Sequence, residues 1–177
     1  MNLQPTVSPR YPLGVVDYTR QGFEIMAAEA NQHWVSPTAT SQNFPSQHLS
    51  GMAQSAVRLI CFGQPIAPEV AQTTIEEMGF LHATLWQMLP FARKFPQIQK
   101  KLRIVAQGQS WMGRFGLPYF PILATHLSKR YLYVSRPILA LPHTPASWGP
   151  NTHFLVLDPA SSRAPAFSYA GVSRMYM

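Results

Sequence analysis

Apolar residues recur every three or four positions along two stretches of the chain, and this spacing predicts two amphipathic helices. The first helix is expected from Asp17 or Thr19 to Trp34, with one apolar stripe formed by Phe23, Met26, Ala27, Ala30 and Trp34. The second helix is expected from Pro68 to Leu89, with a buried face formed by Val70, Thr74, Met78, Leu81, Leu85 and Met88.

Proline and glycine set the expected limits of the second helix. Pro65 stops what precedes it, Pro68 suits the first helical position, and Pro90 would end it. A helix of this length would span about 33 Å, the width of a small domain. Gly79, in its middle, would mark a close packing contact or a kink.

Shorter apolar or alternating runs predict strands. The run in Gln54–Phe62 is expected to be a buried strand, with a helix end as the alternative. Further strands are predicted at Leu102–Ala106, Tyr131–Ser135 (continued by Ile138–Leu141), His153–Leu157 and within 166–177. The stretch Leu117–Leu127 contains Pro118 and Pro121, so any helix there is expected to begin near Pro121 and to stop by Ser128.

Two segments lack periodicity. Residues 1–17 contain three prolines, which favour extended backbone, and are expected to form an arm that is either disordered or held along a partner. Residues 35–53 are rich in Ser, Thr, Gln and Pro and are expected to form a polar linker. The predicted fold class is therefore α+β: a single domain over 18–177 with one small sheet flanked by two helices, and an extended Pro-rich N-terminal arm.

Composition indicates a folded chain with a sparsely charged surface. The sequence is 46% hydrophobic, but only 12% of its residues are charged, about half the usual share for a soluble domain. We interpret this as a subunit whose surface is largely covered by neighbours. The alternative is a neutral surface rich in Ser, Thr, Gln and Asn.

The charge pattern gives the strongest functional hint. The net charge is +7, and the stretch from Met78 to Leu157 (residues 78–157) contains no Asp or Glu. Nine of the fourteen Lys and Arg residues lie in it: Arg93, Lys94, Lys100, Lys101, Arg103, Arg114, Lys129, Arg130 and Arg136. Such a one-signed field attracts polyanions, among them nucleic acid, anionic lipid and acidic proteins.

Other classes find little support. No run of eighteen apolar residues predicts a transmembrane segment, and the N-terminus has no signal-peptide pattern, so an intracellular, cytoplasmic location is expected. The one cysteine excludes an internal disulfide, and the six histidines show no metal-ligand spacing. Gly-rich nucleotide motifs are absent, so no metal or cofactor is expected.

We therefore predict a non-enzymatic binding subunit of a larger assembly that contacts nucleic acid, either RNA or single-stranded DNA, alongside other protein subunits. The proposed phosphate contacts are Arg93, Lys94, Lys100, Lys101, Arg103, Arg114, Lys129 and Arg130. Trp111, in a Gly-flanked loop, is the proposed stacking platform, whereas Tyr131 and Tyr133 are assigned to the core.

Two alternatives remain open. The chain could be a purely structural protein of a multi-protein or viral assembly, whose cations meet acidic protein surfaces. It could also be a small enzyme with an unrecognised site around Cys61, His82 or His143, which would require a pocket with perturbed titratable groups.

Overall fold

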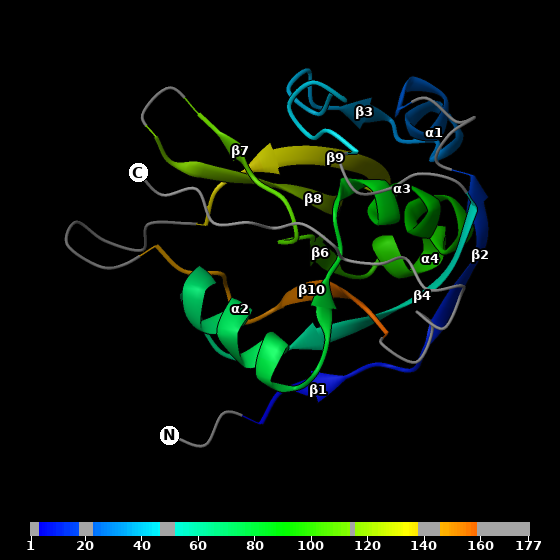
Figure 1. Cartoon of the computed structure of the whole chain (residues 1–177). Coiled ribbons are helices and arrows are strands. Elements are labelled where there is room, and N and C mark those ends of the chain that lie inside the picture. Colours follow the sequence, from blue (N-terminus) through cyan, green and yellow to red (C-terminus); the bar gives the residue numbers. More distant parts are fainter. Residues whose placement is uncertain (1–3, 18–22, 47–51, 114–115, 138–145, 159–177) are drawn as a thin grey trace, which may run out of the picture.

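A ten-stranded mixed sheet is the main element of the residues described by the computed structural model (Figure 1). The structure describes residues 4–17, 23–46, 52–113, 116–137 and 146–158. The strands are β1 (Thr6–Val7), β2 (Tyr11–Asp17), β3 (Trp34–Val35), β4 (Met52–Cys61), β5 (Leu81–His82), β6 (Arg103–Val105), β7 (Trp111–Met112), β8 (Pro118–His126), β9 (Lys129–Ser135) and β10 (Thr152–Leu157). Their order is β1-β4-β10-β6-β8-β9-β3, while β2 pairs with β4, β5 with β10, and β7 with β8. The pairs β6–β10 and β3–β9 are parallel, and the others are antiparallel.

Four short helices within the described residues cover the two faces of this sheet (Figure 1). On one face lie α1 (Phe23–Glu29), α3 (Leu85–Lys94) and α4 (Pro96–Gln99), and on the other lies α2 (Pro68–Glu77). The side chains of β10 show the alternation that this arrangement requires: Leu155 packs into the α1/α3 core, while Phe154 and Val156 pack into the α2 core. The sheet is therefore apolar on both faces.

The predicted fold class, a small sheet flanked by two helices with a projecting arm, is wrong. The sheet has ten strands, and part of the difference comes from the N-terminal segment: β1 and β2 both pair with β4. The described residues of the predicted arm, 4–17, are thus extended but belong to the sheet of their own chain. The division into an arm and a domain over 18–177 itself stays a prediction.

Prolines account for a second difference, in the stretch that we expected to contain a helix. Residues 118–126 form β8, in which Pro121 lies opposite Val134 of β9. Its carbonyl accepts a hydrogen bond from the Ala106 N–H (3.1 Å). A proline pushes the residue before it towards extended geometry, so Pro118 and Pro121 disfavour the helix expected here.

The predicted helix from Pro68 to Leu89 is in fact two helices separated by a strand. Gly79 has a φ of +83°, and the N–H groups of Gly79 and Phe80 donate to the carbonyls of Glu76 (2.9 Å) and Ile75 (3.2 Å). This is a Schellman motif, which ends α2, and Phe80 packs with Ile75 in the α2 core.

The second half of that predicted helix starts anew after β5. Thr84 and Gln87 form a capping box that begins α3, with the Trp86 N–H donating to the Thr84 hydroxyl (3.2 Å). Pro90, expected to end the helix, lies inside α3.

The first predicted helix and the predicted linker also differ from the structure. Among the described residues helix α1 covers Phe23–Glu29 and ends before Trp34, which belongs to the edge strand β3. Within the linker, Phe44 is fully buried, and its carbonyl accepts a hydrogen bond from the Trp86 indole N–H (2.9 Å). One aromatic residue thus anchors a polar segment that shows no periodicity.

Four predicted strands are confirmed. The runs at 54–62, 102–106, 131–135 and 153–157 correspond to β4, β6, β9 and β10. The predicted continuation at 138–141 and the last strand within 166–177 lie outside the described residues.

Candidate nucleic-acid interface

Helix α4 is fixed against the end of the β8–β9 hairpin by one buried amide side chain. The side-chain NH₂ of Gln99 donates to the carbonyls of Ala124 and Tyr131 (3.3 Å each) and to the Gln32 side-chain oxygen (2.6 Å). The Thr125 hydroxyl in turn donates to the Gln99 carbonyl (3.0 Å). Gln99 is completely buried, so these bonds hold α4 and the residues that follow it at a defined place.

Four exposed cations gather at this end of the sheet. Lys100 and Lys101 follow α4 directly, and Arg103 is the first residue of β6. Lys129 is the first residue of β9, opposite His126, after a two-residue turn. Leu127 and Ser128 in that turn have φ values of +46° and +62°, as expected for the tight hairpin turns that match strand twist. We call Lys100, Lys101, Arg103 and Lys129 the basic end.

The sheet register gives the spacing of the basic end. Arg103 and Lys129 are separated by two strand spacings across the sheet and two residues along it, which corresponds to about 12 Å between backbones. None of its four cations forms an ion pair with another described residue. Their charge is therefore available to a ligand.

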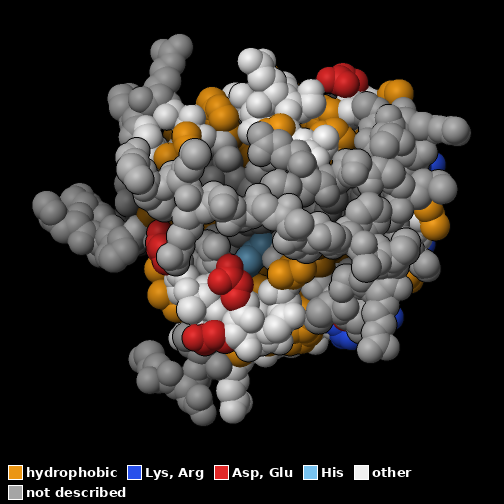
Figure 2. All heavy atoms as spheres, in the orientation of Figure 1, with side chains coloured by type: hydrophobic (Ala, Val, Ile, Leu, Met, Phe, Trp, Pro, Cys, Tyr) orange, Lys and Arg blue, Asp and Glu red, His pale blue; other side chains and the backbone are white. Residues whose placement is uncertain are grey.

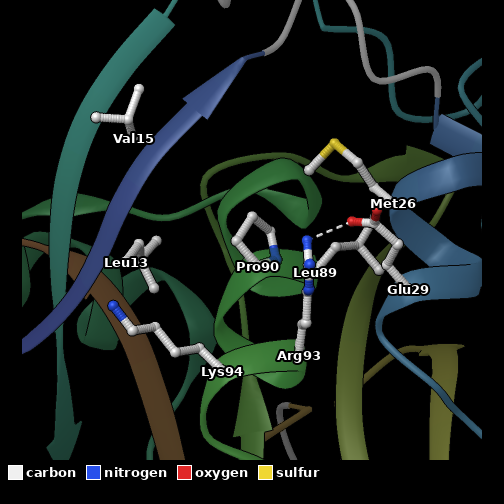
Figure 3. A pocket seen from close by; sticks show the side chains of 8 residues that line it. All are labelled: Leu13, Val15, Met26, Glu29, Leu89, Pro90, Arg93 and Lys94. Carbon is white, nitrogen blue, oxygen red and sulfur yellow. Dashed lines mark hydrogen bonds and ion pairs between the residues drawn. The ribbon is translucent and has the colours of Figure 1, made fainter.

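Arg93 and Lys94 lie elsewhere, on α3 at a groove between β2, α1 and α3 (Figure 3). Arg93 points towards Glu29 and forms an ion pair with it (2.5 Å), while Lys94 points towards β2 and lies 5.9 Å from the centroid of the Phe95 ring. The groove has a volume of about 300 Å³ and is otherwise apolar, being lined by Leu13, Val15, Met26, Leu89 and Pro90. Because Glu29 neutralises Arg93, only Lys94 adds net charge there.

Arg130 is buried and holds the fold together. It is 7% exposed, and its guanidinium donates to the carbonyls of Ala92 (3.0 Å) and Asn31 (2.6 Å), at the C-terminal ends of α3 and α1. Burial lowers the pKa of the Arg130 guanidinium, but an arginine stays protonated in proteins. A side chain committed in this way does not reach a phosphate at the surface, so this predicted contact is not supported.

Trp111 is remote from the basic end, and Arg114 lies outside the described residues. Trp111 belongs to β7, opposite Tyr119 near the start of β8, and the two ring centroids are 5.5 Å apart. Five residues of strand, about 17 Å, separate Tyr119 from Ala124. The structure thus brings together four of the nine residues predicted from the sequence, and the predicted stacking platform is not beside them.

Three aromatic residues that the sequence did not assign to the site lie closer. Trp34 is 42% exposed, and its ring centroid lies 5.5 Å from that of Tyr133. Tyr131 and Tyr133 stack at 5.6 Å with an interplanar angle of 17°, and both are half-buried. We call Trp34, Tyr131 and Tyr133 the aromatic strip. The alternation in YLYVS was the available signal for the two tyrosines, whereas the helical spacing around Trp34 concealed its place in a strand.

Of the residues suggested for an enzyme, the two that the structure describes, Cys61 and His82, lie apart along the sheet. The imidazole of His82 donates through Nε2 to the Gln72 carbonyl (3.3 Å), and burial lowers the pKa of that imidazole, partly offset by this bond and by Glu76. Cys61 lies opposite His153 of β10 and His82 opposite Val156, about 10 Å further along the same strand. His143 falls outside the described residues, which contain no group of three His, Cys, Asp or Glu side chains able to hold a metal.

The exposed acidic side chains of the described residues belong to helices α1 and α2. In Figure 2 acidic side chains lie over α2, which carries the exposed residues Glu69, Glu76 and Glu77, and also at the upper edge, whereas Lys and Arg appear at the right and lower right of that view. Asp158 is buried and forms an ion pair with Arg58 (2.9 Å). In the described part of the chain, no helix has the length and apolar character needed to cross a membrane.

Searches of protein-family models, of curated proteins and of solved structures find no match to this chain.

Proposed function

We propose that this chain is a non-enzymatic binding protein that contacts nucleic acid through its basic end, as one subunit of a larger assembly. The observation that supports the proposal is the convergence of Lys100, Lys101, Arg103 and Lys129 on one end of the sheet without ion-pair partners among the described residues. Lysine and arginine neutralise phosphates and release counterions, and this electrostatic term dominates nucleic-acid affinity.

The mixture of side chains suits a phosphate backbone. Arg103 can bind a phosphate through two parallel hydrogen bonds, whereas the three lysines act as flexible point charges. The 12 Å estimated between Arg103 and Lys129 is wide enough to engage more than one phosphate of a strand.

Salt dependence of binding tests the proposal quantitatively. Fluorescence anisotropy of a labelled 20-mer oligonucleotide should report binding at 50 mM salt that weakens as salt rises. Four cations on single-strand phosphates give a slope of log affinity against log salt of about −3. The double variant Lys100→Gln/Lys101→Gln should reduce that slope by about 1.4, because two contacts are removed.

Arg136→Gln is a matched control for the single variant Lys101→Gln, because each substitution removes one positive charge. Arg136 is exposed, but it follows β9 at the end opposite to Lys129. We expect the affinity of Arg136→Gln for the oligonucleotide to be less than twofold below that of wild type. A flat salt response, no binding at 50 mM salt, or equal losses in Arg136→Gln and Lys101→Gln would refute the proposal.

The competing hypothesis is that the basic end binds an acidic protein and not nucleic acid. If the basic end binds such a partner, a complex purified from its native source should keep its composition after nuclease treatment. The proposal predicts instead that nuclease releases a nucleic-acid component.

A further inference from the structure

The aromatic strip occupies one face of the sheet edge. Edge strand β3 runs parallel to β9, with Trp34 in register with Tyr131 and Val35 with Leu132. Leu132 is fully buried in the α1/α3 core, and successive side chains of a strand point to opposite faces. Trp34, Tyr131 and Tyr133 therefore share the other face.

Main-chain hydrogen bonds hold this edge in place. The N–H of His33 donates to the Arg130 carbonyl and that of Ser36 to the Leu132 carbonyl (2.8 Å each), on either side of Trp34. The Arg130 N–H in turn donates to His33 Nδ1 (3.2 Å). An exposed indole on a backbone fixed in this way is preorganised, so a ligand that contacts it pays little for ordering it.

The strip continues directly into the basic end. Extending the β6–β8 register by one residue places Arg103 opposite Ala124, which lies opposite Tyr131, which is in register with Trp34. This row crosses four strands on one face, and Lys129 lies on the same face two residues before Tyr131. Ala124 is the smallest side chain of the row, so little side-chain volume separates the cation from the rings.

We propose that the aromatic strip stacks unpaired bases, so that the ligand of the basic end is single-stranded nucleic acid. The inference depends on the proposed function and specifies its substrate class. Every base has a π-face, and stacking on aromatic side chains binds single strands with little sequence preference. In a duplex those faces are already stacked on neighbouring bases, and aromatic side chains on the surface of a sheet cannot reach them.

The binding test compares strand forms with variants of the strip. Anisotropy titrations would use dT20, U20 and a 20-base-pair DNA duplex at one salt concentration. Wild type should bind both single strands at least about fivefold more tightly than the duplex. Trp34→Ala should bind the single strands about five- to a hundredfold more weakly than wild type, and the duplex less than twofold more weakly. Trp34→Phe should lose less affinity for the single strands than Trp34→Ala, because phenylalanine keeps an aromatic ring on which a base can stack.

Tryptophan fluorescence provides a second readout that does not depend on affinity alone. Trp86 and Trp148 are buried, at 5% and 1% exposed, so saturating dT20 should quench chiefly Trp34. The quenching should disappear in Trp34→Phe and persist in the matched variant Trp111→Phe, whose indole lies on β7.

The possible failures can be told apart. If wild type binds neither single strands nor duplex, the proposed function and this inference both fail. If Lys100→Gln/Lys101→Gln weakens binding while Trp34→Ala does not, or if Trp34→Ala weakens single strands and duplex equally, only the stacking role is refuted. Equal wild-type affinity for single strands and duplex would also refute it, as would quenching that persists in Trp34→Phe.

Discussion

Replacing Arg130 with methionine should destabilise the fold without removing a ligand contact. Its guanidinium donates to the carbonyl of Ala92, in the last turn of α3, and to that of Asn31, just after α1. Both carbonyls lie at the negative ends of helices, where a cation is favoured. Methionine fills much of the volume of the arginine stem but donates no hydrogen bond.

The expected loss in the free energy of unfolding comes from the hydrogen bond that each of the two carbonyls loses. The Ala92 carbonyl is in a buried bond, and leaving it unsatisfied costs about 1–3 kcal/mol. Asn31 is exposed, so its carbonyl regains water, and its loss costs less than about 1 kcal/mol. We therefore expect the free energy of unfolding to fall by about 1–4 kcal/mol, which for a chain of this size lowers Tm by roughly 2–16 °C.

Circular-dichroism melts and urea titrations measure this change. Lys129→Met, at the neighbouring exposed position, is the control and should change the free energy of unfolding by less than about 0.5 kcal/mol. Arg130→Lys should lie between wild type and Arg130→Met, because an ammonium can satisfy one carbonyl but not both. If Arg130→Met melts within about 2 °C of wild type, the structural role assigned to Arg130 is wrong.

Two further stability predictions concern the region around α2. Gly79→Ala should reduce the free energy of unfolding by about 1–2 kcal/mol, because the φ of +83° disfavours any L side chain although a Cβ there meets no atom within 4 Å. Gly149 is equally open and has no positive φ, so Gly149→Ala should be nearly neutral. Equal urea midpoints for the two variants would contradict the Schellman assignment. Because burial lowers the pKa of His82 in the folded state, the unfolded chain binds more protons below about pH 6.5, and stability should fall as the pH drops from 7.5 to 5. In His82→Gln the free energy of unfolding should vary less over that range, and an unchanged pH dependence would exclude His82 as its source.

Strand positions were readable from the sequence, whereas their pairing was not. The runs that became β4, β6, β9 and β10 are apolar or alternating over several residues, and that local signal is sufficient for a strand. The size of the sheet depends instead on short strands such as β1, β3 and β5, each two residues long. Two residues carry no period, so only their partners in three dimensions define them as strands.

The predicted long helix failed for a different physical reason. The apolar spacing from Val70 to Met88 is continuous, yet it joins residues of α2, β5 and α3. Gly79 was the decisive residue, because glycine after a helix favours the left-handed conformation that ends it. A mid-pattern glycine followed five residues later by Thr84, with Gln87 three residues beyond it, contains a stop and a start signal that outweigh the hydrophobic period.

The acid-free stretch predicted one cationic surface. In the fold, some of its cations are instead bound by carbonyl or carboxylate oxygens of the same chain. Arg130 lies within reach of two carbonyls at helix ends and is buried, and Arg93 lies within reach of Glu29 and is paired. The four cations of the basic end form no ion pair with another described residue. They lie just after α4 and at the first residues of β6 and β9, whereas the described exposed carboxylates belong to α1 and α2. A sequence count cannot make this division, since Glu29 and Arg93 are 64 positions apart and Asn31 and Arg130 are 99 apart. The same long-range pairing that removes Arg130 from the surface also fixes β3 beside β9, and so the aromatic strip beside the cations that remain.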